Sequence, residues 1–159
     1  MSLETRLAVL KKDLLSPSGP AISTNRSYPF AIFQYVPSEE FKARQAVGTL
    51  AQELELAGWR VRTVDLFQVL ADYLAAQEGG GLVAAIIEEE KLQYTAYGKD
   101  WTKSLDYLSN TLSAHCNDAE GYPARVLESI QEVARESDPA RTVVFLSRIG
   151  SLFPFYRTS

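Results

Sequence analysis

Residues that build metal centres and disulfides are nearly absent from this 159-residue sequence, which has one cysteine and one histidine. A single cysteine excludes an intrachain disulfide and is typical of proteins in the reducing cytoplasm. A structural zinc site needs several such ligands, and His115 and Cys116 are too few. Because neighbours on a helix do not face each other, we interpret this pair as a helix end with a buried thiol rather than as a nucleophile and its base. We therefore predict no metal site.

A strongly basic charge and long apolar runs are also missing. The formal net charge is −4 and the isoelectric point is about 5.1, which leaves no overall positive field to attract nucleic acid. The apolar runs fall well short of the ~20 residues that span a bilayer, and residues 1–7 lack the apolar core of a secretory signal. We therefore expect a cytoplasmic protein that makes no membrane contact. An apolar fraction of 46% can form the core of one folded domain over residues 1–159.

Three apolar segments predict β-strands. Residues 30–36 (FAIFQYV) are apolar on both alternating faces, which is typical of a strand covered on both sides in the middle of a parallel sheet. Residues 59–66 and 142–146 predict further strands, and the residues between them, about 67–138, predict a helical insertion. Because parallel strands are joined by crossovers that place helices on the sheet, we expect an α/β fold of three layers. Its sheet is mostly parallel, has at least three strands and carries helices on both faces.

Capping residues mark the expected helix ends. Leucines at helical spacing over residues 3–14 predict an amphipathic helix. Ser38 is a plausible N-cap for the helix after the first predicted strand, and Gly58 is a suitable stop. Asp100 suits the start of a later helix. Asp65 would hold a ribose in a dinucleotide-binding domain, but we favour a capping role for it at the helix that follows.

The loop after the first predicted strand lacks glycine. Residues 37–44 (PSEEFKAR) match neither the P-loop nor the dinucleotide fingerprint. Glu39 and Glu40 would repel a phosphate at the helix start, where the helix dipole would otherwise attract it. We therefore predict no phosphate-binding loop and no cofactor. The run Glu88–Glu90 is typical of a solvated helix face rather than of an acid–base pair, so we identify no catalytic residue.

The segment after the last predicted strand combines arginines with apolar residues. In open α/β sheets, ligands bind at the carboxyl ends of the strands, and arginine beside aromatic residues is typical of interface anchors. The candidate partner-binding residues are Arg148, Leu152, Phe153, Phe155, Tyr156 and Arg157. The alternative interpretation is a segment that packs back on the sheet, and the sequence favours neither.

Three pieces of the chain together resemble a known family. They are residues 28–35 (YPFAIFQY), residues 58–67 (GWRVRTVDLF), and residues 143–157, which end in Gly-x2-Phe-Pro-Phe-x-Arg. On these motifs the chain resembles the BrxB family of BREX phage-defence systems. Family members continue past this ending into an asparagine-containing stretch and a further apolar strand. The resemblance therefore implies a C-terminally truncated member.

The resemblance implies a role in assembly rather than in catalysis. BrxB proteins are small components of operons that methylate host DNA and block phage replication, and they have no established catalytic residues. The implied function is a non-enzymatic adaptor that binds another BREX protein, with the alkaline-phosphatase-like PglZ as the expected partner. One alternative is a degenerate nucleotide- or nucleic-acid-binding domain that uses Arg148 and Arg157. Another is a hydrolase, for which the sequence offers no set of convergent titratable groups.

Overall fold

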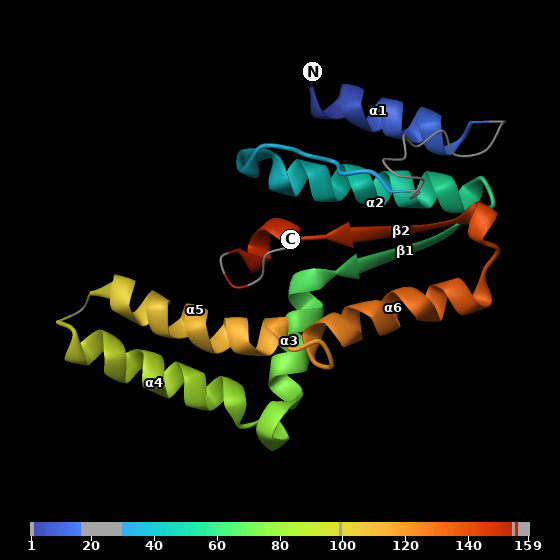
Figure 1. Cartoon of the computed structure of the whole chain (residues 1–159). Helices are drawn as coiled ribbons and strands as arrows, with labels where there is room; N and C mark the ends of the chain where they lie inside the picture. Colours follow the sequence, from blue (N-terminus) through green and yellow to red (C-terminus); the bar gives the residue numbers. More distant parts are fainter. Residues whose placement is uncertain (1, 17–29, 99, 154, 156–159) are drawn as a thin grey trace. The chain divides into compact units, whose positions relative to one another are not determined.

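The computed structural model describes residues 2–16, 30–98, 100–153 and 155 (Figure 1). Helices make up 72% of the structure, and one sheet of two parallel strands is present in the described residues. The strands are β1 (Arg60–Asp65) and β2 (Thr142–Ser147), which confirms the strands predicted at 59–66 and 142–146. The expected three-layer fold with a sheet of at least three strands is wrong, because a sheet of two strands cannot form its central layer.

The prediction of a strand at residues 30–36 is the source of this error. Within the described chain the segment pairs with no strand, and Phe30, Ile32 and Val36 are 54%, 75% and 54% exposed. A central strand of a parallel sheet would be buried on both faces. Since β1 pairs directly with β2, no position remains between them for a third strand. The apolar segment instead contacts α1 (Leu3–Leu14) and α2 (Glu40–Leu56) through side chains.

The chain forms two compact units, one of Met1–Arg62 with Ser137–Val143 and one of Thr63–Glu136 with Val144–Ser159. In the first unit, α1 and α2 bury an apolar seam that includes Leu3, Leu14 and Leu54, as the leucine spacing predicts for α1. An ion pair joins the two helices, with Lys11 Nζ 3.0 Å from Glu53 Oε2.

The start of α2 differs from its prediction. Residues Pro37–Glu39 form a single 3₁₀ turn (η2), and Ser38 lies inside it. The N-cap positions of η2 and α2 are Val36 and Glu39, and neither makes a side-chain capping bond, so the expected Ser38 cap is wrong. The end of α2 is as predicted, because Gly58 follows it with φ of 84°, a conformation that glycine adopts without strain.

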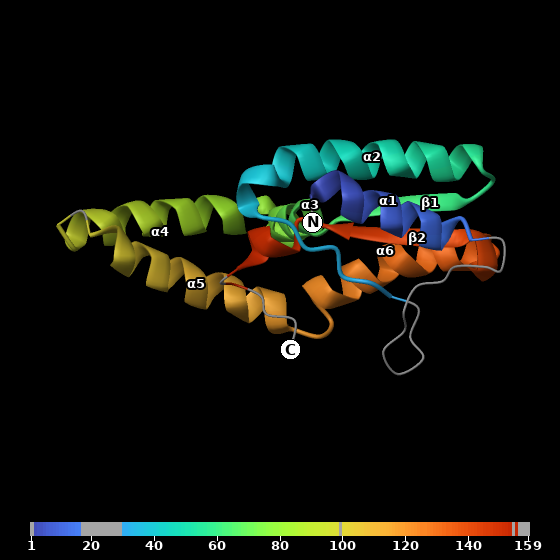
Figure 2. The same cartoon turned by 90° about the horizontal axis from the view of Figure 1, so that it is seen from above.

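The second unit is mainly helical between the strands, in the region where helices are predicted. Its elements are α3 (Leu66–Ala76), η3 (Gln77–Gly80), α4 (Leu82–Ala96), α5 (Trp101–Asn117), α6 (Tyr122–Glu136) and η5 (Ile149–Leu152). Figures 1 and 2 show α4 and α5 side by side as an antiparallel hairpin. Asp100 accepts a hydrogen bond from the Thr102 N–H at 2.9 Å, which confirms its capping role at α5.

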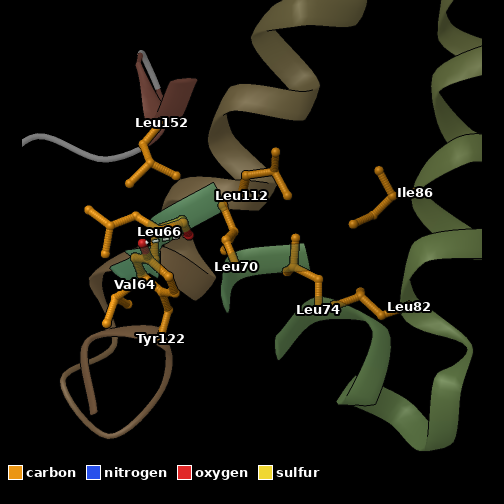
Figure 3. Close-up of a cluster of buried hydrophobic side chains, with 10 residues drawn as sticks. Val64, Leu66, Leu70, Leu74, Leu82, Ile86, Leu112, Tyr122 and Leu152 are labelled. Carbon is orange, nitrogen blue, oxygen red and sulfur yellow. Dashed lines mark hydrogen bonds between the residues drawn. The ribbon is translucent and has the colours of Figure 1, made fainter. Parts of the chain in front are cut away.

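The core of the second unit gathers around α3. Its buried members are Val64, Leu66, Leu70, Leu74, Leu82, Ile86, Leu112, Cys116, Tyr122 and Leu152. Figure 3 shows Leu82 and Ile86 of α4 on the Leu74 side of this cluster, with Leu152 beside Leu66. Tyr122 is 1% exposed, and its hydroxyl donates to the Leu66 carbonyl at 3.0 Å, which satisfies a polar group inside an apolar core. This core fixes the ends of β1 and β2 relative to α3.

Candidate functional site

The carboxyl ends of β1 and β2 bring together two charged side chains that are 83 residues apart in the sequence. Arg148 Nη1 lies 3.2 Å from Asp65 Oδ2, and both side chains are partly exposed. Just inside this pair, the Ser147 hydroxyl donates to the Val64 carbonyl at 3.4 Å. Parallel pairing produces this arrangement, because both strands end at the same edge of the sheet.

Arg148 has an unusual backbone conformation. Its φ and ψ angles are 60° and 30°, in the left-handed region that costs a non-glycine residue about 1–2 kcal/mol. The guanidinium carbon lies 4.3 Å from the centre of the Phe67 ring, a favourable cation–π distance. The ring and the Asp65 carboxylate therefore hold the guanidinium from two sides. A non-glycine residue kept in this region is a feature that clusters at functional sites.

Asp65 has two roles in this arrangement. Its Oδ1 accepts the Gln68 N–H at 3.0 Å at the start of α3, so the predicted capping role is confirmed. Its Oδ2 binds Arg148. The position of the carboxylate is therefore fixed by the helix, and the carboxylate in turn orients the arginine.

The six predicted partner-binding residues fall into three groups. Arg148 and Phe153 are accessible, with Phe153 67% exposed. Leu152 is 1% exposed and belongs to the core, and Phe155 is half-buried against the core with its carbonyl accepting the Ser113 hydroxyl at 3.1 Å. These two residues therefore resemble the alternative interpretation, in which the segment packs back on the sheet, although the core that they contact also includes residues of the helices. Tyr156 and Arg157 lie outside the described residues.

Two exposed apolar residues that we did not select from the sequence also belong to this region. Ile149 in η5 is 48% exposed and Phe67 at the start of α3 is 40% exposed. We call Phe67, Arg148, Ile149 and Phe153 the strand-end surface. Phe67 could have been found from its position two residues after the acid that ends β1, whereas the sequence contains no signal that separates Ile149 from the buried Leu152.

The glutamates at the start of α2 are engaged with side chains of their own unit. Glu40 accepts the Tyr35 hydroxyl at 2.5 Å and pairs with Arg44 Nε at 3.3 Å. Glu39 lies 4.0 Å from Arg6 Nη2. The hydrogen bond to Glu40 raises the pKa of Tyr35 to about 12, with smaller contributions from burial and from the negative charge of the carboxylate. Both carboxylates therefore bind side chains of the first unit, and Glu39 at the N-cap position makes no side-chain bond to the backbone of α2.

His115 and Cys116 make contacts inside the second unit. Cys116 is fully buried in the core, and burial raises the pKa of its thiol. The His115 ring lies 6.4 Å from the Tyr73 ring, in an edge contact. Among the described residues, no group of three or more His, Cys, Asp or Glu side chains is arranged to hold a metal ion.

In the same part of the chain, every helix is too short or too polar to cross a membrane.

Comparison with known proteins leaves the family open. The chain matches no protein-family model, no curated protein and no solved structure. The resemblance to BrxB therefore stays a prediction that depends on the motifs at residues 28–35, 58–67 and 143–157.

Proposed function

We propose that this chain is a non-enzymatic adaptor of a BREX phage-defence system and that its strand-end surface binds PglZ. The resemblance supports the choice of system and partner. The location of the surface is supported by one observation, which is that an arginine restrained by Asp65 and by the Phe67 ring is followed within five residues by the exposed side chains of Ile149 and Phe153. Aromatic residues and arginine are the residue types most enriched at interface hot spots.

The exposed area of Phe153 is large enough for such a role. An aromatic side chain presents about 150–250 Å², so the 67% exposure of Phe153 leaves roughly 100–170 Å² to be buried by a partner. At about 25 cal/mol per Å² this burial would contribute about 2.5–4 kcal/mol, the range of a hot spot. Arg148 adds a donor group whose ordering cost is reduced, because Asp65 and Phe67 already restrain it.

A nucleotide- or nucleic-acid-binding role has weaker support. That hypothesis uses Arg148 and Arg157, of which the structure describes Arg148. The positive charge of Arg148 is balanced by the Asp65 carboxylate at 3.2 Å. A phosphate would have to displace this carboxylate, which also caps α3. Binding through phosphate contacts would weaken steeply with added salt, whereas binding through an apolar surface would change little.

The test is binding of the purified chain to full-length PglZ from the same operon, measured by calorimetry at two salt concentrations. We expect association, and we expect Phe153→Ala to weaken it about 30-fold or more. Trp101→Ala is the matched control, because Trp101 is an aromatic residue of equal exposure, 66%, on α5. The proposed partner is wrong if no association occurs. The proposed surface is wrong if Trp101→Ala weakens binding and Phe153→Ala does not.

A further inference from the structure

The segment Phe30–Val36 has one backbone edge that makes no hydrogen bond to the described residues. Exposure alternates over residues 32–36, with Phe33 and Tyr35 half-buried between exposed neighbours, which is the period-two pattern of a strand. One edge is in use, because Gln34 O accepts Arg6 Nη1 and Val36 O accepts the Glu39 N–H at 2.8 Å. On the other edge, the backbone N–H and C=O groups of Phe33 and Tyr35 have no hydrogen-bond partner in the described chain.

Side-chain contacts hold the segment in this conformation. The Arg6 guanidinium lies 5.8 Å from the Phe33 ring centre, and the Phe33 and Tyr35 rings are 6.2 Å apart. The Tyr35 hydroxyl binds Glu40 on α2. One face of the segment is therefore fixed to the helices of the first unit. The opposite face presents Ile32 at 75% exposure and Val36 at 54% exposure.

We propose that this free edge pairs with the same segment of a second copy of the chain, as two antiparallel strands. Residues 30–36 contain no charged side chain, so an identical strand meets no like charge, and a charged partner would gain no complementary contact. An exposed apolar strand with unpaired backbone groups is the typical acceptor for strand addition. A two-fold symmetric contact is closed, so it forms a dimer rather than a fibre.

One register uses the unpartnered backbone groups of both Phe33 and Tyr35. If Gln34 lies on the two-fold axis, Phe33 of one copy forms a hydrogen-bonded pair with Tyr35 of the other, through the backbone groups that lack partners. Ile32 then lies opposite Val36 on the exposed face. The two Gln34 side chains lie opposite each other, and a side-chain amide can both donate a hydrogen bond to an identical amide and accept one from it. Pro37 ends the pairing because it has no N–H to donate.

The oligomeric state of the full chain tests this proposal. We expect the mass from light scattering to rise from monomer to dimer with concentration, in the range of about 100 µM, because a pairing this short buries less than a stable interface needs. Hydrogen exchange at the Phe33 and Tyr35 amides should slow about tenfold or more over the same range. If the two amides are as well protected at concentrations where the chain is monomeric as where it is dimeric, the strand pairs within one chain. If they exchange freely at all concentrations, the strand does not pair. Either result overturns the proposal.

Charge substitutions at Gln34 test the register. Gln34→Lys and Gln34→Glu each place like charges opposite one another and should abolish the dimer, whereas an equal mixture of the two variants should restore it. Gln52→Lys, at an exposed glutamine on α2, is the control and should leave the dimer unchanged. A dimer that survives both Gln34 variants uses another surface, and the proposal is then wrong. Because these experiments do not involve PglZ, their failure leaves the proposed adaptor function standing.

Discussion

The left-handed conformation of Arg148 predicts an inverted order of stability between two variants. Alanine normally stabilises a folded chain relative to glycine, because it restricts the unfolded state. At φ of 60° the folded state instead penalises every residue that has a Cβ atom. We therefore expect Arg148→Gly to be more stable than Arg148→Ala.

The magnitude follows from the contacts of Arg148. Both variants lose the stacking on Phe67, about 0.5–1 kcal/mol, and a partly exposed ion pair with Asp65, about 0–1 kcal/mol. The shared loss is about 1.2 kcal/mol on these values. Glycine recovers about 1–2 kcal/mol of strain and gives up about 0.4–1 kcal/mol to unfolded-state entropy, a net gain of about 0.8 kcal/mol. Arg148→Ala should therefore be destabilised by about 1.2 kcal/mol and Arg148→Gly by about 0.4 kcal/mol.

Urea denaturation followed by tryptophan fluorescence and circular dichroism measures both differences. Asn110 is an exposed residue within α5, and there the same pair of substitutions should follow the normal order, with alanine about 1 kcal/mol more stable than glycine. If alanine is also the more stable residue at position 148, the strain argument is refuted and Arg148 does not adopt the left-handed conformation in solution.

Three further substitutions, with a fourth as a control, test packing and pH dependence. Leu54→Ala should cost about 2–5 kcal/mol, because Leu54 is 0% exposed, whereas the same change at Leu56, 89% exposed, should cost less than about 0.5 kcal/mol. Gly121→Ala should cost about 1–3 kcal/mol, since its new Cβ would lie 2.6 Å from the Tyr73 hydroxyl. Tyr35 has a folded-state pKa of about 12 against 10.0 for the free group, so its stabilising contribution is complete below pH 10 and is lost between pH 10 and 12. Tyr35→Phe should remove that part of the alkaline loss of stability.

Urea titrations of the variants check all of these values, and the phenolate absorbance of wild type minus Tyr35→Phe isolates the titration of that one tyrosine. Equal effects at Leu54 and Leu56 would contradict the packing of α2. A neutral Gly121→Ala would mean that the Tyr73 ring moves aside. An ordinary tyrosine pKa in the difference spectrum would mean that the Tyr35–Glu40 hydrogen bond does not persist in solution.

Two helix starts were predictable because a single side chain bonds to nearby backbone. Asp65 and Asp100 cap helices as expected, and hydrogen bonds from the hydroxyl and N–H of Thr102 lower the pKa of Asp100. Such bonds form within three residues, so they depend little on the rest of the fold. The Ser38 prediction was wrong because a 3₁₀ turn shifts the start of α2 by one residue, and the pattern of polar residues does not distinguish the two starts.

The candidate site was predictable only in its position. The chain order places the site after the last strand. It does not determine which residues of that segment face solvent. Leu152 and Phe153 are adjacent and equally apolar, and one is 1% exposed while the other is 67% exposed. The η5 turn, which depends on the left-handed conformation of Arg148 and on the core beneath it, decides between them.

The sequence by itself determined the helices, their main caps, the two strands and the absence of a glycine-rich loop, because each depends on local periodicity or on contacts within a few residues. Tertiary structure alone decided that β1 pairs with β2 and that residues 30–36 stay outside the sheet. The two paired strands are about 80 positions apart in the sequence, as the hydrogen bond from the Ser147 side chain to the Val64 carbonyl at their ends also shows. An apolar run does not specify its partner, since burial against helices, a neighbouring strand or a second chain satisfies the same side chains.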